Sequence, residues 1–370
     1  MDSPYRDEFE LVQAVVRAAA GLSQSLLRSA DKGVVAKDDL SPVTVADFAI
    51  QGLLCASIHA RFPSDGFVGE ESADDLRANP ALLARVWDLL GTAASSPPPS
   101  SDPITLPRNP QHMCDLIDLC GNGTPGEPGA GRVWVFDPID GTQTFVRGEA
   151  YAINTALLVD GEQVLSVIGC PTLPVSSPGP VHNATVDPTN QGLLIFGARG
   201  HGVYVTPLLK QGTGAEPQPP PRRLEPHATA ATRDTLRSVS CFNLLDSGVE
   251  DVHKAVMQSL DIPLPGCDLL GWVPRWVTLA LGLANVTVWV YKRRDRHGKV
   301  WDHAGAMMLF EELGGKITDV DGRPIDLTAG RKMTGNHGFV AAPAQLHSLV
   351  LDTVQDIIRK EGKSHLLATD

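Results

Sequence analysis

The chain has 370 residues, of which 42% are hydrophobic and 20% charged, and its formal net charge at pH 7 is −12. Such a length suits one large or two medium domains, because single cores stop growing near ~250–300 residues. The negative charge argues against a nucleic-acid polymer as partner, because phosphate-backbone binding needs clustered Lys and Arg. No segment approaches the roughly 18 apolar residues that span a bilayer, so we expect no membrane protein.

The cysteines and the chain ends indicate a compartment. The six cysteines form no C-x-x-C pair and have no close histidine partner, which argues against a zinc site or a disulfide framework. The first residues are acidic where a secretory leader is basic, and the last ones match no common retention signal. We therefore expect a cytoplasmic protein with reduced thiols, either a monomer or a homodimer.

The first half of the chain predicts helices followed by antiparallel strands. Apolar residues at helical spacing predict helices over 7–29 and 45–60, the second after the N-cap candidate Thr44. The Pro- and Ser-rich stretch 91–110 is predicted to be an exposed loop that supplies no core. Strands follow from residue 131, with hairpins that turn at Asp160-Gly161 and within 192–207.

The second half predicts alternating helices and strands. After the proline-rich connection 211–230, strand-like runs alternate with helical patterns, which is typical of an α/β lobe. The expected lobes are residues 1–190 and 191–370. The predicted helices are 249–260, 275–284 and 303–314, and the predicted strands are 238–242, 286–290 and the start of 316–327.

A pair of carboxylates follows the first of these strands, in the motif DPIDGT. A tight turn could aim Asp137, Asp140 and the Ile139 carbonyl at one divalent cation, which prefers oxygen ligands. Gly141 and Thr142 come next, where N–H groups at a helix start suit a phosphate. Two close like charges are costly unless a cation neutralises them. Asp, Pro and Gly also form ordinary turns after strands, so both readings stay open for the motif alone.

Three further segments carry candidate acids. SPVTVAD ends at Asp47, FVGEES contains Glu70 and Glu71, and KVWDHAGA contains Asp302. Taken singly, each fits a solvated surface or a helix cap, and Asp302 fits an N-cap. His303 beside Asp302 is expected to cap or pack, as a histidine at a helix start usually does.

The order SPVTVAD, VGEES, DPIDGT and WDHAGA resembles the inositol monophosphatase superfamily of Mg²⁺-dependent, lithium-sensitive phosphatases. Within it, the chain is most similar to 3′(2′),5′-bisphosphate nucleotidases, because DPIDGT continues into FVRGEAYAINTALLVDG and VIGCPTL, and LALGLANV precedes WDHAG. The resemblance covers residues from about 10 to about 355. It implies an α/β fold, the layered αβαβα sandwich of the inositol monophosphatase and fructose-1,6-bisphosphatase type.

The resemblance also assigns roles to the candidate residues. It implies two or three Mg²⁺ ions, a Thr142–Asp47 dyad that orients and deprotonates the attacking water, and phosphate binding by Gly141 and Thr142. Glu71 would act behind the ligands. The implied metal ligands are Glu70, which also counts as catalytic, Asp137, Asp140, Asp302 and the Ile139 carbonyl.

The segments expected to recognise the substrate depart from the nucleotidase pattern. Gln143 stands where these enzymes usually have a lysine, and residues 238–248 do not match their nucleotide loop. Their Asp-Ser and Lys-Tyr pairs align with Gly271, Trp272, Arg275 and Trp276. Arg275 is a candidate phosphate-binding cation and Trp272 a candidate for stacking on a flat group, although aromatic core packing fits the tryptophans equally well.

The expected activity is hydrolysis of a small phosphate ester, with a nucleotide as the first candidate. The leading substrate is 3′-phosphoadenosine 5′-phosphate, or 3′-phosphoadenylyl sulfate, giving AMP, or adenylyl sulfate, and phosphate. One alternative is an inositol phosphate or another small ester. A second is non-hydrolytic (di)phosphate chemistry or ligand binding on the same fold.

Overall fold

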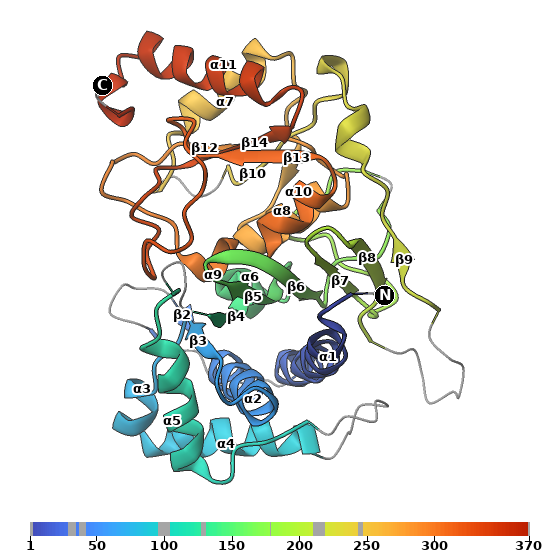
Figure 1. The fold of residues 1–370 in the computed structure, drawn as a ribbon, viewed down its shortest axis with the longest axis vertical. Coiled ribbons are helices and arrows are strands. Elements are labelled where there is room, and N and C mark those ends of the chain that lie inside the picture. The colour runs from blue at the N-terminus through green and yellow to red at the C-terminus, as the bar shows by residue number, and fades with distance from the viewer. Residues whose placement is uncertain are drawn as a thin grey trace.

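The computed structural model describes residues 3–28, 35–36, 42–94, 104–126, 131–177, 179–209, 219–242 and 247–368. Its elements form five layers, helices alternating with sheets, as Figure 1 shows from the bottom to the top of the view. This arrangement confirms the predicted αβαβα sandwich. No helix in the described part of the chain is both long and apolar enough to cross a membrane.

A seven-stranded sheet forms the second layer. Its strand order is β3-β4-β5-β6-β7-β8-β9, with β3 parallel to β4 and all other neighbours antiparallel. Both predicted hairpins are confirmed, and Asp160 and Gly161 turn the first with φ angles of 51° and 86°, the left-handed values of a two-residue hairpin turn. The strands are β3 (Gly66–Gly69), β4 (Arg132–Asp140), β5 (Ala152–Val159), β6 (Glu162–Cys170), β7 (Leu193–Ala198), β8 (Gly202–Pro207) and β9 (Arg222–Arg223).

Two long helices cover one face of this sheet. They are α1 (Arg6–Arg28) and α2 (Val45–Arg61), both as predicted, and their apolar faces form the first core with the sheet. The predicted cap is confirmed, because the Thr44 side chain accepts a hydrogen bond from the Ala46 N–H. Farther out lie α3 (Asp74–Ala78), α4 (Pro80–Ala94) and α5 (Pro110–Gly121), while β1 (Val35–Ala36) and β2 (Pro42–Val43) precede α2.

The prediction that 91–110 is an exposed loop without core is wrong in two respects: its start is helical, and its second half supplies core. Helix α4 continues through its first residues, to Ala94. Ile104 and Leu106 pack against the first core, and the Ser57 hydroxyl donates to the Thr105 carbonyl at 3.1 Å. Isolated apolar residues in a proline-rich segment are therefore enough to hold its end against α2. Residues 95–103 lie outside the described residues, as do residues 211–218 of the second proline-rich stretch.

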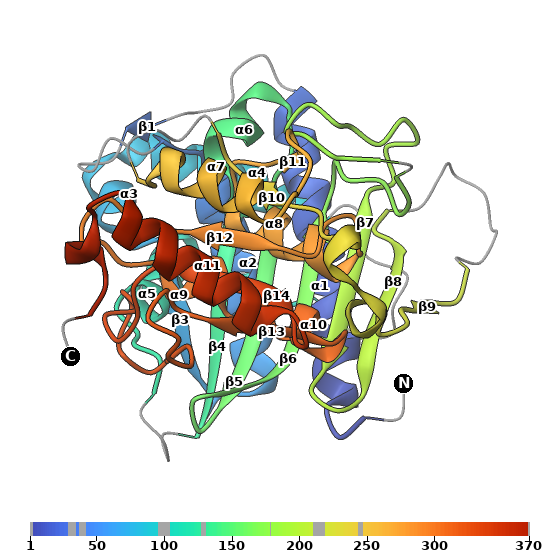
Figure 2. The ribbon, with the colours of Figure 1, turned by 90° about the horizontal axis from the view of Figure 1, so that it is seen from above.

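The other face of the large sheet carries α8 (Trp272–Ala280), α9 (Val300–His303) and α10 (Ala306–Glu312), which share a second core with it. Above them lies an antiparallel sheet with the order β12-β14-β13. Figure 2 looks down on α7 and α11, which cover its outer face. The bounds are β12 (Thr287–Trp289), β13 (Gly315–Thr318), β14 (Phe339–Pro343), α7 (Glu250–Ser259) and α11 (His347–Lys360).

Short elements complete the upper layers. The parallel pair β10 (Val239–Ser240) and β11 (Cys267–Asp268) lies beside α8. Three 3₁₀ turns cover His227–Ala230, Arg233–Thr235 and Ser364–Leu366. The predicted lobe boundary near residue 190 falls between β6 and β7 of one continuous sheet, and the division into lobes stays a prediction.

Two helix predictions in this half need correction. The predicted helix 275–284 begins at Trp272 and ends at Ala280. The predicted helix 303–314 begins only at Ala306, as α10, and His303 ends the preceding helix α9. The two helices are separate because Gly305 has a φ of +81° and approaches β5 so closely that a Cβ there would lie 2.7 Å from Ala156 Cβ. Asp302 is consequently not an N-cap: it lies in the first turn of α9, whose N-cap is Lys299.

Candidate active site

A β-bulge brings the two carboxylates of DPIDGT onto one face of the sheet. Asp137 pairs with Asn154 and Asp140 with Ala152, so two residues of β4 lie opposite the single residue Ile153. In a regular strand, residues three apart face opposite sides. The extra residue in the bulge restores a common face, and bulges often redirect side chains in this way beside functional sites. Ile139, inside the bulge, packs into the first core instead.

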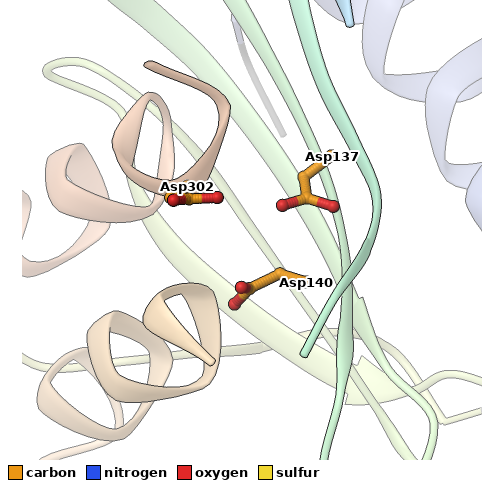
Figure 3. A group of neighbouring side chains, drawn as sticks. All are labelled: Asp137, Asp140 and Asp302. Carbon is orange, nitrogen blue, oxygen red and sulfur yellow. The ribbon is translucent and has the colours of Figure 1, made fainter. Parts of the chain in front are cut away.

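The third aspartate comes from α9, far along the chain. One ligand oxygen from each of Asp137, Asp140 and Asp302 lies within 4.8 Å of the others, and Figure 3 shows the three carboxylates turned toward one common space. Asn154 on β5 holds α9 here, because its Nδ2 donates to the carbonyls of Trp301 at 2.7 Å and Ala304 at 3.0 Å. Reasoning from the sequence missed Asn154, whose only signal was a polar residue within an apolar strand.

Burial and like charge shift the titration of all three groups. Burial raises the pKa of Asp137 well above its usual range, and the charges of Glu70, Asp140 and Asp302 raise it further. Burial also raises the pKa of Asp302, with Asp140 and Glu70 adding to the shift. Burial raises the pKa of Asp140 to about 7, although the Val273 N–H, which donates to its Oδ2 at 2.5 Å, opposes this. The cluster is therefore costly to ionise without a counter-charge.

Glu70 lies beside this cluster, at the end of β3. Its charge contributes to the raised pKa of both Asp137 and Asp302. The main chain of the next residue, Glu71, is held by Gln51 on α2, which accepts from the Glu71 N–H at 2.9 Å and donates to the Glu71 carbonyl at 2.7 Å. The structure thus brings Glu70 near the aspartates, and its role as a ligand stays a prediction.

A divalent cation fits this set of donors. The atoms are carboxylate oxygens, which Mg²⁺ prefers, and they converge from two elements onto one space. Asp137 Oδ1 is buried and has no hydrogen-bond partner among the described residues. Buried polar atoms usually have a partner, so this oxygen is free to accept a ligand.

The residues predicted to form the water-activating dyad and the phosphate site lie in the turn after β4 and at the start of α2. Thr142 opens helix α6 (Thr142–Arg147), and its hydroxyl donates to the Ile139 carbonyl at 3.1 Å. Asp47 is fully buried in the first turn of α2, where it accepts from the Thr44 N–H at 2.8 Å and hydroxyl at 2.6 Å. Helix α6 contacts β2, which leads into α2. The dyad, the phosphate contacts of Gly141 and Thr142, and the Ile139 ligand remain predictions.

Arg275 and Trp272 lie at the N-terminal part of α8. The guanidinium is completely buried, with Nε donating to the Leu269 carbonyl at 2.8 Å and Nη2 to the Leu270 carbonyl at 2.7 Å. Its carbon lies 4.2 Å from the centre of the Trp272 ring and 4.7 Å from that of Trp289. These contacts make Arg275 part of the core in this conformation. Its contact with substrate is an untested prediction.

The half-buried Trp272 ring is packed by other aromatic side chains. It stacks on Trp276 at 5.9 Å and meets His303 edge-on at 4.8 Å between ring centres. His303 Nδ1 accepts from Trp276 Nε1 at 3.0 Å, so the expectation that His303 packs is confirmed. The core-packing alternative for the tryptophans is thus realised, and stacking of Trp272 on a ligand stays a prediction.

The family follows from a comparison with known proteins. A model of the inositol monophosphatase family matches residues 7–359. The chain belongs to this family. Its members are metal-dependent phosphatases, and the buried aspartate cluster suits that activity.

Alignments with similar proteins cover almost the whole of this chain. A 3′(2′),5′-bisphosphate nucleotidase of Emericella nidulans is 32% identical over 365 residues, covering 96% of this chain and 99% of the relative. A 3′(2′),5′-bisphosphate nucleotidase 1 of Candida albicans is 31% identical, with 96% of each chain covered. The extragenic suppressor protein suhB of Bartonella henselae is 16% identical with a TM-score of 0.56, over 94% of this chain and 98% of that one. This last likeness supports the fold alone.

Proposed function

We propose that this family member is a Mg²⁺-dependent phosphomonoesterase whose first substrate is 3′-phosphoadenosine 5′-phosphate, or 3′-phosphoadenylyl sulfate. The products are AMP, or adenylyl sulfate, and phosphate. The observation that carries the proposal is the convergence of Asp137, Asp140 and Asp302 on one space. The choice of nucleotide rests on the relatives at 32% and 31% identity, which are bisphosphate nucleotidases.

The three aspartates, with Glu70 and the Ile139 carbonyl, would hold two or three Mg²⁺ ions. Bound Mg²⁺ supplies positive charge that acidifies a water molecule and stabilises the phosphate and leaving-group oxygens. The residues of the chain provide the remaining chemistry, without a covalent intermediate.

Thr142 and Asp47 act on the attacking water in this proposal. The Thr142 hydroxyl donates to the carbonyl of Ile139, which lies in the bulge between Asp137 and Asp140. This hydroxyl orients the water. Asp47 accepts the proton through the dyad, and its own hydrogen bonds to Thr44 hold it in place. The N–H groups of Gly141 and Thr142 bind the phosphate, because the first N–H groups of a helix have no partner within it. Lithium inhibition is expected from the family resemblance.

A second candidate substrate is an inositol phosphate or another small phosphate ester. The observation that favours it is the burial of Arg275, which directs its donors to the Leu269 and Leu270 carbonyls. A substrate with one phosphate needs no cation at that position. Non-hydrolytic (di)phosphate chemistry or ligand binding is the third possibility, and product analysis distinguishes it.

Phosphate release from a substrate panel tests the proposal. The full chain is incubated with Mg²⁺ and 3′-phosphoadenosine 5′-phosphate, 3′-phosphoadenylyl sulfate, an inositol monophosphate or AMP, and products are identified by mass spectrometry. We expect AMP and phosphate from the first compound, no turnover after chelation, and recovery on adding Mg²⁺. Release from another ester alone would remove the bisphosphate nucleotide as substrate. Binding without phosphate release from any compound would contradict the hydrolase.

A further inference from the structure

Arg331 contacts two segments: the end of β3, which leads into Glu70, and the start of α9, which carries Asp302. It lies in the connection between β13 and β14, and its side chain reaches the end of β3 while its main chain reaches the start of α9. We propose that Arg331 is a positioning residue that fixes Glu70 and Asp302 relative to each other and so sets the affinity for Mg²⁺. The inference rests on the proposed function, because it needs a metal at this site.

The side chain of Arg331 binds the backbone around Glu70. Nη2 donates to the Gly69 carbonyl at 2.6 Å and, more weakly, to the Glu70 carbonyl at 3.5 Å. Nη1 donates to the carbonyls of Cys120 at 3.1 Å and Gly123 at 3.0 Å, at the end of α5. A guanidinium is a rigid planar fork of donors, so it fixes these carbonyls relative to one another.

These contacts complete a clamp on the Glu70 segment. Gln51 holds Glu71 from the side of α2, through both its N–H and its carbonyl. Arg331 holds Gly69 and Glu70 from the side of the C-terminal half. The pairing of β3 with β4 ends at Gly69, so the contacts of Arg331 continue the support one residue beyond the sheet.

The main chain of Arg331 holds the segment around Asp302. Its carbonyl accepts from the N–H of Val300, the first residue of α9, at 3.0 Å. Its guanidinium carbon lies 4.7 Å from the centre of the Trp301 ring, the neighbour of Asp302. The loop continues alongside, since the Met333 N–H donates to the Gly298 carbonyl at 3.0 Å.

Helix α9 depends on such outside contacts for its orientation. It has only four residues, too few for a stable helix in isolation. Asn154 holds its C-terminal end through the Trp301 and Ala304 carbonyls, and Arg331 holds its N-terminal end. Side chains behind metal ligands typically change metal affinity or activity about 10–100-fold when they are removed.

The test compares Mg²⁺ binding by the full-length chain with the Arg331→Met, Arg331→Lys and Arg17→Met variants. Methionine keeps the apolar length but removes every donor, and lysine offers a point charge without the fork. Arg17 is a matched control, because its Nη1 also donates to two main-chain carbonyls, that of Pro207 at 2.8 Å and that of Leu208. Pro207 ends β8 and Leu208 follows it, and neither belongs to the segments that carry the acidic residues of the site. Titration calorimetry with Mg²⁺ alone gives Kd, and thermal unfolding in a chelator gives stability.

We expect Arg331→Met to raise the Kd for Mg²⁺ about tenfold, Arg331→Lys to raise it less, and Arg17→Met to lower stability with an unchanged Kd. An unchanged Kd in Arg331→Met, or an equal rise in Arg17→Met, would overturn the positioning role while leaving the proposed function intact. Absence of Mg²⁺ binding by the wild type would overturn both. If Arg331→Met does not fold, Arg331→Lys decides: a raised Kd supports the role and an unchanged Kd refutes it.

Discussion

Two groups of buried charge meet at the first turn of α8, and the protein treats them in opposite ways. The acidic group is Asp140 with its neighbours Asp137 and Asp302, whose oxygens face one another. The basic group is Arg275, whose donors reach two carbonyls and whose face lies against two tryptophan rings. The arginine is satisfied largely by the protein itself, whereas the aspartates repel each other.

The contrast indicates which charge belongs to the scaffold and which to a binding site. A buried charge is tolerated when hydrogen bonds and polarisable neighbours replace its hydration. Arg275 meets most of this condition through Nε, Nη2 and the two tryptophan rings, although its Nη1 has no hydrogen-bond partner among the described residues, so it contributes to the structure of α8. The aspartates do not meet it, since burial and mutual repulsion raise their pKa values. A bound cation supplies what they lack.

The largest effect is expected from Asp140→Asn. We predict a loss of turnover of at least about 100-fold, because a ligand matters more than the residues behind it. The metal-free variant should be no less stable than the wild type, since one buried acid is gone, and it should gain no stability from Mg²⁺. Turnover assays and thermal unfolding with and without Mg²⁺ measure both.

Asp187→Asn is the matched control for this variant. Asp187 is also buried, but its carboxylate accepts from the Gly192 N–H at 2.8 Å and the Gln191 N–H at 3.0 Å. We expect this variant to lose stability and to keep its Mg²⁺ dependence. Full activity in Asp140→Asn, or equal Mg²⁺ responses in the two variants, would contradict the contrast between satisfied and unsatisfied carboxylates.

A smaller effect is expected from Arg275→Lys. Lysine cannot reach both the Leu269 and Leu270 carbonyls in the forked geometry of the guanidinium. We predict a loss of about 2 kcal/mol in the free energy of unfolding, because hydrogen bonds from charged groups contribute ~1.5–3 kcal/mol. The KM for the phosphate ester should change little. Unchanged stability with a much higher KM would instead make Arg275 a substrate contact, as the family resemblance suggests.

Gly271→Ala tests whether the position of Asp140 at the start of α8 matters for Mg²⁺ binding. A Cβ at residue 271 would lie 2.7 Å from Asp140 Oδ2 and 3.0 Å from Pro274 Cδ, so one of them must move. We predict roughly tenfold weaker Mg²⁺ binding, comparable to the loss of a residue behind the ligands. Titration calorimetry of the full chain measures it, and a wild-type Kd would show that Asp140 need not be held in this position.

The smallest effect concerns His253. Its ring centre lies 5.0 Å from that of Trp289, one of the two tryptophans that pack against Arg275. Burial, helped by the Arg275 charge, lowers the pKa of His253 from 6.5 to about 3, and its Nε2 accepts from the Val290 N–H at 2.8 Å. Because the unfolded chain takes up a proton below pH 6.5 and the folded chain does not, stability falls as the pH drops.

We predict a loss of about 1 kcal/mol from this histidine between about pH 7.5 and about pH 5.8. Denaturant unfolding at the two pH values measures it, with His253→Gln as the control, since glutamine has no titrating group. An equal pH dependence in the two proteins would show that His253 is not kept neutral by the fold.

The periodicity of the sequence predicts much of the fold. Helices α1 and α2, the Thr44 cap and both hairpins follow from local patterns, because each depends on residues close together in the chain. The break between α9 and α10, which delays the predicted helix 303–314 to Ala306, was not predictable in this way. It depends on how closely Gly305 approaches β5, a contact between distant segments.

The sequence by itself identified the candidate acidic residues, because each of the four acidic motifs is a local feature. Only the tertiary structure decided their geometry. The bulge that puts Asp137 and Asp140 on one face exists only through the pairing of β4 with β5. The burial of Arg275 and the contacts of Arg331 likewise depend on packing between segments far apart in the chain. Local propensity carries no information about such contacts, which is why the acids were predictable and their supports were not.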